Sequence, residues 1–390
     1  MEDVKDFLEA GNQLVREQNW SDAATHWENA RTAFPDAPLG YWQGIDALIR
    51  LEQFDAAWEL AGVLETKMPN SFIAQFYLAN LTCRRGQWEK AVKRFEGLKI
   101  KFPKREGQIQ ENPYHRQAVF NAKGIMEGSR ALKPVVQNPG LEADENAPKK
   151  FLFVSGMPRA GTTAMGHLLN GCRDVSMFTE IYNPYRAYNR YDFAPRILED
   201  RIQQMHNAGE TRVIKRFNSE TFVGDKRPLF QYSMLHTFEE LSSYPVTVFH
   251  MLRDVLAVCA SYSKRAQNPK DSWDTLRGLS QCIHELNMSH RLIQQMHEGF
   301  ELQHNHHVVY VDYMRMFRDG PYATSVLEQA GAKFYPEKLE AFQQDSGNRK
   351  KSPIKNKDIL REALHEQLDF TAARAVEEIT GISLLDDLTS

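Results

Sequence analysis

Hydrophobic positions in the first hundred residues recur every 34 residues. Each copy carries an aromatic residue, an alanine three positions later, a further apolar residue four positions after that, and a closing proline. These positions are Trp20, Ala23, Trp27 and Pro35; Phe54, Ala57, Ala61 and Pro69; and Trp88, Ala91, Phe95 and Pro103. A helix pair of this length cannot bury both of its apolar faces alone, so neighbouring pairs must stack. The pattern therefore predicts three stacked helix-turn-helix pairs.

In period and hydrophobic positions this pattern resembles the tetratricopeptide repeat (TPR). The resemblance implies an all-α TPR solenoid over residues 1–104. Residues 115–132 predict a helix that closes the solenoid, and the Pro/Gly/Asn-rich segment 137–150 predicts a linker, which together make residues 105–148 a capping helix and linker. The sequence leaves open whether the repeats are a scaffold, a contact to a second copy in a homo-oligomer, or a surface that recruits a substrate.

From residue 149 to 390 the chain alternates short apolar runs with helical patterns. This alternation predicts a three-layer α/β domain with a parallel sheet between helices. Phosphate ligands bind such domains at the carboxyl ends of the strands. The predicted strands are residues 151–155, 212–215, 246–252 and 308–311. The first predicted helix begins at residue 163, two more cover residues 255–263 and 273–300, and a further helix ends near residue 329.

The first predicted strand runs into Gly156-Met-Pro-Arg-Ala-Gly161-Thr-Thr, which has the spacing G-x-x-x-x-G-x-[ST]. Such a P-loop-like segment lets backbone amides and a helix start surround an anion. Thr162 stands where a nucleotide-binding P-loop has lysine, the residue that helps to neutralise a triphosphate. The missing lysine argues against ATP or GTP and favours a smaller anion such as a 5′-phosphosulfate.

Residues 151–169 resemble the 5′-phosphosulfate loop of sulfotransferases that use 3′-phosphoadenosine 5′-phosphosulfate (PAPS). The likeness is to the P-R-S-G-T-T form found in tyrosylprotein sulfotransferases and in bacterial sulfotransferases with TPRs. It implies that the donor contacts the loop residues Arg159, Ala160, Gly161, Thr162 and Thr163. Ala160 replaces the family's serine, which removes one hydroxyl donor, worth about 1 kcal/mol.

A second motif, about 90 residues further on, resembles the family's 3′-phosphate site, R-D-P-x(5)-S. Arg253 and Asp254 end a predicted strand, and Ser261 follows eight residues after the arginine. Val255 replaces the proline but removes no ligand group. The resemblance implies that Arg253 pairs with the 3′-phosphate and that Ser261 faces the same ligand. Taken alone, Arg253-Asp254 would read as a salt bridge at a strand end.

Sulfuryl transfer requires a base for the acceptor hydroxyl and cations at the oxygens that gain charge. The resemblance implies Glu180 as the base, although Phe178 stands where the family has glycine, and a surface carboxylate is the alternative. Lys215 resembles the lysine of the family's D-K-x-P-x-N stretch. The resemblance implies that Lys215 stabilises the leaving phosphate together with Arg159; a surface lysine is the alternative. Tyr310, in a strand like the family's V-x-Y-E-D-L, lies either near the donor or in the core.

Two further clusters admit more than one interpretation. Histidines 304, 306 and 307 suggest a metal site, but no carboxylate or cysteine is placed to complete it, and sulfuryl transfer requires no metal. Tyrosines 182, 185, 188 and 191 follow Glu180 and either line an acceptor cleft or pack in the core.

Composition narrows the function classes. The net charge of −3 gives no electrostatic case for nucleic acid or an anionic membrane, and no run reaches the roughly 20 apolar residues of a membrane helix. Four separated cysteines and an acidic N-terminus predict a reduced, cytoplasmic protein. The sequence thus predicts a PAPS-dependent sulfotransferase whose acceptor hydroxyl belongs to a peptide tyrosine, a glycan or a small molecule. The alternatives are a P-loop kinase and a TPR adaptor with a relict nucleotide-binding domain.

Overall fold

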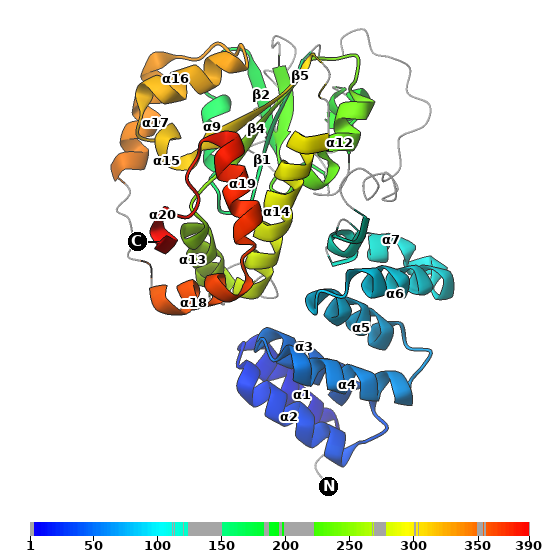
Figure 1. The fold of residues 1–390 in the computed structure, drawn as a ribbon. Coiled ribbons are helices and arrows are strands. Elements are labelled where there is room, and N and C mark those ends of the chain that lie inside the picture. Colours follow the sequence, from blue (N-terminus) through cyan, green and yellow to red (C-terminus); the bar gives the residue numbers. More distant parts are fainter. Residues whose placement is uncertain are drawn as a thin grey trace. The chain divides into compact units, whose positions relative to one another are not determined.

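The computed structural model describes most of the chain (Figure 1). The described residues are 4–110, 112, 114–119, 121–123, 150–182, 187–194, 197–198, 222–266, 268, 278–299, 302, 304–348, 354 and 356–389. By their internal contacts, the residues divide into two compact units, Met1–Lys133 with Ser263–Gln281, and Pro134–Tyr262 with Cys282–Ser390. The predicted domain boundary at residue 148 lies outside the described residues.

The N-terminal unit begins with three helix pairs that repeat at 34-residue intervals. The helices are α1 (Val4–Arg16), α2 (Trp20–Ala33), α3 (Pro38–Arg50), α4 (Phe54–Lys67), α5 (Phe72–Arg84) and α6 (Trp88–Lys101). The second helix of each pair ends in the same backbone conformation, with φ between −133° and −129° at Phe34, Met68 and Phe102. The sequence period is therefore also a period of the backbone.

The repeated small and aromatic positions form the contacts between these helices. Ala23, Ala57 and Ala91 are fully buried, as are Trp27 and Phe95. The alanines allow close helix packing, and the aromatic side chains fill the space between successive pairs. A short 3₁₀ turn, η1 (Pro103–Arg105), and α7 (Glu106–Gln110) follow α6. Residues 114–119 and 121–123 are helical, which accounts for part of the predicted capping helix.

The C-terminal unit is an α/β domain with a five-stranded, all-parallel sheet in the order β2-β3-β1-β4-β5. The strands are β1 (Lys150–Gly156), β2 (Val175–Thr179), β3 (Phe222–Lys226), β4 (Val246–Leu252) and β5 (His306–Asp312). The predicted strands at 151–155, 246–252 and 308–311 are thereby confirmed, whereas 212–215 lies outside the described residues. Two of the observed strands, β2 and β3, were not predicted.

Helices cover both faces of the sheet, as Figure 1 shows. One face carries α9 (Thr162–Leu169) with α15 (Tyr313–Met316), α16 (Gly320–Gln329) and α17 (Pro336–Asn348), and the other carries α12 (Gln231–Glu240) and α14 (Leu279–Gly299). The strand order accounts for this, because right-handed crossovers that run in opposite directions along a sheet place their helices on opposite faces. The crossover from β1 to β2 carries α9, whereas those from β3 to β4 and from β4 to β5 run the other way and carry α12 and α14. The remaining elements are η2 (Arg190–Phe193), α13 (Val255–Ala266), α18 (Lys357–Gln367), α19 (Phe370–Thr380) and α20 (Asp386–Thr389). Among the described residues, no helix is long and apolar enough to cross a membrane.

Candidate functional site

All five parallel strands end at the same edge of the sheet, and each contributes a residue there. The residues at or directly after the strand ends are Gly156 (β1), Glu180 (β2), Lys226 (β3), Arg253 (β4) and Tyr313 (β5). The chain leaves β1 towards β2 but leaves β4 towards β5, so the connections diverge between the adjacent strands β1 and β4. Ligands of open α/β sheets bind at such a divergence, outside the carboxyl ends of the strands.

The segment Gly156–Gly161, here called the glycine loop, requires glycine at both ends. Gly156 has φ of +134°, and a Cβ atom there would lie 2.6 Å from the carbonyl oxygen of Met251. Gly161 has φ of +99°, and a Cβ atom there would lie 2.2 Å from the ring of Tyr313. Residues with a side chain rarely adopt such φ values, and neither position has space for a side chain. The two glycines thus hold the loop against the ends of β4 and β5.

Among the predicted loop residues, Gly161, Thr162 and Thr163 stand at the start of a helix, whereas the amide of Ala160 is already engaged. The helix α9 starts at Thr162, and the first amides of a helix have no acceptor within it. Thr163 is exposed and Thr162 is buried. The Ala160 amide, however, donates to the Met157 carbonyl at 3.0 Å and closes the turn. We therefore count the amides from Gly161 onward, and not that of Ala160, as potential anion donors.

The structure brings the second predicted motif directly to this loop. Arg253 Nη1 donates to the Arg159 carbonyl oxygen at 2.8 Å, and Arg159 Nε donates to Ser261 Oγ at 2.9 Å. The Arg253 guanidinium also lies 4.4 Å from the centre of the Tyr313 ring, and its buried Nε has no hydrogen-bond partner. Two arginines from segments about 90 residues apart therefore share one location at the sheet edge.

Asp254 plays a different part from the salt bridge considered for this motif. Its carboxylate accepts hydrogen bonds from the amides of Ala257, at 2.9 Å, and Asp387, at 3.2 Å. Burial raises the pKa of the Asp254 carboxyl, against the opposing effect of these backbone donors. The aspartate thus caps the start of α13, the helix that carries Ser261.

Glu180 lies beside a lysine that the sequence did not single out. Lys226 Nζ donates to Glu180 Oε1, and the Glu180 amide donates back to the Lys226 carbonyl at 3.0 Å. The lysine side chain is 3% exposed and that of the glutamate 52%, so only the carboxylate faces solvent extensively. The predicted Lys215 lies outside the described residues.

A sequence signal for Lys226 existed. Residues 225–228 read Asp-Lys-Arg-Pro, which matches the D-K-x-P pattern that we applied to Lys215. The strand end that carries this stretch also contacts the glycine loop, because the Leu229 amide donates to the Gly156 carbonyl at 2.9 Å. The pair of Glu180 and Lys226 therefore lies at the same edge as the two arginines.

A buried polar cluster forms around Asp225, the residue that precedes Lys226 on β3. The Tyr188 hydroxyl donates to Asp225 Oδ2, and the Arg227 guanidinium stacks on the Tyr188 ring at 4.3 Å. Burial raises the pKa of the Asp225 carboxyl to about 6, although Arg227 opposes the shift. Tyr188 and Tyr182 are buried, so these two tyrosines pack in the core and do not line a cleft; Tyr185 lies outside the described residues.

Tyr310 lies on β5, and the centre of its ring lies 5.9 Å from the centre of the His250 ring on the neighbouring strand. Burial raises the pKa of the Tyr310 hydroxyl to about 12. The tyrosine that contacts both the glycine loop and Arg253 is instead Tyr313, three residues further on. Sequence reasoning missed Tyr313 because its position depends on where β5 ends.

Of the three histidines in residues 304–307, His306 and His307 begin β5, and His304 lies in the turn before it. His306 is buried, and its Nε2 lies 3.4 Å from the Leu241 carbonyl. Within the described parts of the chain, no group of three or more His, Cys, Asp or Glu side chains is arranged to hold a metal ion.

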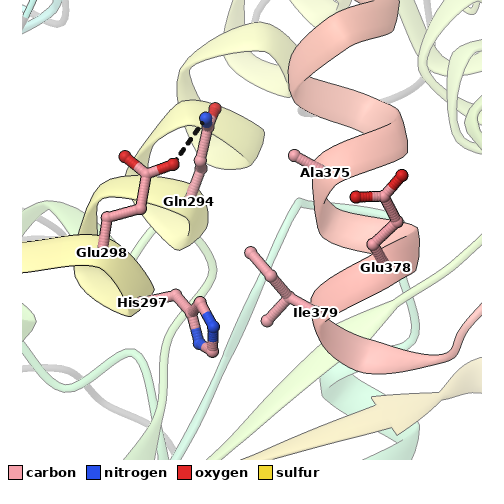
Figure 2. Close-up of a pocket in the computed structure, with 6 residues that line it drawn as sticks. All are labelled: Gln294, His297, Glu298, Ala375, Glu378 and Ile379. Atoms are coloured by element: carbon pink, nitrogen blue, oxygen red, sulfur yellow. Dashed lines mark hydrogen bonds between the residues drawn. The ribbon is translucent and has the colours of Figure 1, made fainter.

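A cleft of about 320 Å³ lies between α14 and α19 (Figure 2). Its lining residues are Gln294, His297, Glu298, Ala375, Glu378 and Ile379. Two carboxylates border this cleft and disfavour an anion there, and none of the predicted site residues lines it. The strand edge, with its two arginines and a lysine, is therefore the better candidate for an anionic ligand.

Comparison with protein-family models gave no match, and comparison with curated proteins gave none either. The chain is therefore characterised by its fold and its site. The chain combines an N-terminal array of helices with an α/β domain that gathers two arginines, a lysine and a glutamate at the carboxyl edge of a parallel sheet.

Proposed function

We propose that the chain is a sulfotransferase that transfers a sulfuryl group from PAPS to a hydroxyl group. One observation carries the proposal: the glycine loop and the Arg253 motif, each matched to a different end of the donor, are joined by hydrogen bonds of 2.8 and 2.9 Å. The residues fit such a ligand. The loop has glycines of positive φ at both ends, and Arg253 Nε is a buried donor without a partner.

The two ends of the donor would be held by different parts of the site. The glycine loop, with amides from Gly161 to Thr163, binds the 5′-phosphosulfate, and Arg159 adds positive charge. Arg253 and Ser261 bind the 3′-phosphate, for which the planar guanidinium is suited. PAPS supplies the sulfuryl group, and adenosine 3′,5′-bisphosphate is the product released.

The pair of Glu180 and Lys226 supplies the acid–base chemistry. The Glu180 carboxylate takes the proton of the acceptor hydroxyl, whose oxygen forms a bond to sulfur as the bond between sulfur and the phosphate oxygen breaks. Lys226 and Arg159 stabilise the negative charge that develops on that phosphate oxygen. We assign Lys226 the role predicted for Lys215, because Lys226 is the described lysine that contacts Glu180.

The helical array would bind the acceptor. We propose that the three helix pairs are TPRs and that they recruit a protein or a glycan whose hydroxyl enters the site. The support is the 34-residue backbone period and the repeated buried alanines. The array is a separate compact unit, which suits a larger acceptor better than a small molecule.

Binding and transfer can be tested separately. We expect calorimetry to detect adenosine 3′,5′-bisphosphate binding that Arg253→Ala weakens at least tenfold and that Arg374→Ala, a change at an exposed arginine of α19, leaves unchanged. Transfer of labelled sulfate from PAPS to peptide, glycan or phenolic acceptors then tests the reaction. Binding of magnesium-ATP in preference to the bisphosphate would instead support a kinase, and absence of any nucleotide binding would support an adaptor.

A further inference from the structure

Residues near the C-terminus contact the motif that begins with Arg253. Residues 382–389, here called the C-terminal tail, lie beside the start of α13 (Figure 1). The Val255 amide donates to the Leu384 carbonyl at 2.9 Å, and the Asp387 amide donates to Asp254 Oδ2 at 3.2 Å. These bonds involve the two residues that directly follow Arg253.

The tail is itself held by side chains of α18 and α19. Glu377 Oε1, on α19, accepts hydrogen bonds from the Leu384 amide at 2.6 Å and the Leu385 amide at 3.1 Å. Arg361 Nη2, on α18, donates to the Asp387 carbonyl at 2.9 Å. The side chains of Leu384, Leu385 and Leu388 are buried. The tail is therefore a packed element and not a loose end.

Asp254 joins the tail to the site. One of its carboxylate oxygens accepts from the Ala257 amide in the first turn of α13, and the other accepts from the Asp387 amide in the tail. Arg253 precedes this aspartate, and its guanidinium reaches back to the Arg159 carbonyl. Because the backbone at Asp254 and Val255 is held from the tail side, the direction in which Arg253 leaves β4 is also fixed.

We propose that the C-terminal tail is a positioning element for Arg253, acting through Asp254 and Val255, so that release of the tail selectively weakens recognition of a 3′-phosphate. This inference rests on the proposed function for the identity of the ligand. The hydrogen bonds described above join the tail to Asp254, Val255, Arg361 and Glu377, none of which belongs to the glycine loop or to α9. Recognition of a 5′-phosphate group should therefore not depend on it.

The test uses Glu377, which is not one of the proposed ligand-binding residues, with a matched control. Glu377→Ala removes the acceptor that holds the tail, whereas Glu377→Gln keeps an oxygen in the same place. Calorimetry on the full chain measures the affinity for adenosine 3′,5′-bisphosphate and for adenosine 5′-monophosphate. We expect the alanine variant to bind the bisphosphate about tenfold more weakly, the size of effect of one charge-assisted hydrogen bond, with the monophosphate unchanged and the glutamine variant like the wild type.

A second variant covers the case in which Glu377→Ala fails to fold. Asp387→Pro removes the amide that donates to Asp254 together with the aspartate side chain, at a first-turn position of α20 where proline is tolerated. Asp387→Ala removes the same side chain but keeps the amide. The proline variant should lose the preference for the bisphosphate, and the alanine variant should keep it. Equal weakening of both nucleotides, or an unchanged preference in the proline variant, would overturn the inference.

Hydrogen exchange separates this inference from the proposed function. Amides at residues 255–258 should exchange faster in Glu377→Ala than in Glu377→Gln, whatever nucleotide the protein binds. If the wild type shows no preference for the bisphosphate, the proposed 3′-phosphate site is wrong while the exchange data still report on the tail. If exchange at these residues is the same in both variants, the tail does not hold the turn, and the inference fails.

Discussion

Two buried histidines should make the α/β unit sensitive to mild acid. His250 on β4 and His290 on α14 are 1% and 2% exposed, and each has a ring nitrogen without a hydrogen-bond partner. Burial lowers the pKa of each imidazole from 6.5 to about 4, and for His250 the nearby His290 adds to the shift. The fold therefore accommodates both histidines in the neutral form.

The sign and size of the effect follow from proton linkage. Well above pH 6.5 neither the folded nor the unfolded chain protonates these rings, so the unit has its full stability. As the pH falls from 6.5 towards 4, the unfolded chain binds protons that the folded chain does not, and the free energy of unfolding decreases. A pKa depressed by this amount corresponds to about 3 kcal/mol for each histidine by pH 4, at 1.36 kcal/mol per pKa unit. A typical domain has only about 5–15 kcal/mol in total.

Hydrogen exchange of β4, corrected for the intrinsic rate at each pH, measures this loss between pH 7 and 4.5. Tryptophan fluorescence is the wrong probe, because five of the six tryptophans lie in the helix pairs. His250→Gln should flatten the pH dependence whatever its effect on stability at pH 7, whereas His167→Gln, at an exposed position on α9, should leave the slope unchanged. Equal slopes in the wild type and His250→Gln would refute the assignment of the acid sensitivity to His250.

Three further predictions concern the candidate site. Arg253→Lys, which keeps the charge but not the planar fork, should weaken adenosine 3′,5′-bisphosphate binding by about 1–3 kcal/mol in calorimetry; unchanged affinity would exclude a two-point contact with the phosphate. Glu180→Gln should bind the bisphosphate normally but lose about 10²–10⁴-fold in transfer rate from labelled PAPS, and a fully active variant would mean that another group is the base. Gly161→Ala should destabilise the α/β unit by about 1–3 kcal/mol in denaturant unfolding and abolish binding, because its Cβ would meet Tyr313; Gly97→Ala, at a position on α6 with no atom within 4 Å, should be neutral or stabilising.

Local sequence determined the helix pairs and the outer frame of the site. Each helix pair makes the same kind of contacts with its neighbour, so the same residue types recur in all three pairs. The resulting 34-residue period locates all six helices. In the α/β unit, the apolar runs at β1 and β4 are buried along almost their whole length, and such runs read as strands without further information. The glycine loop and Arg253 were recognisable because each directly follows one of these strands.

Only the tertiary structure decided the middle of the sheet and the partner of Glu180. The strand β3 has the sequence FVGDK, which is too polar to predict as a buried strand, yet it lies between β1 and β2. Gly224 is required there, because a Cβ atom would lie 1.5 Å from the Leu152 carbonyl oxygen of β1. The parallel register then sets Thr179 opposite Lys226 and so brings Glu180 to the lysine. Strand propensity depends on burial and on neighbouring strands, so a pairing between residues 46 positions apart is fixed by the assembled sheet and not by either segment alone.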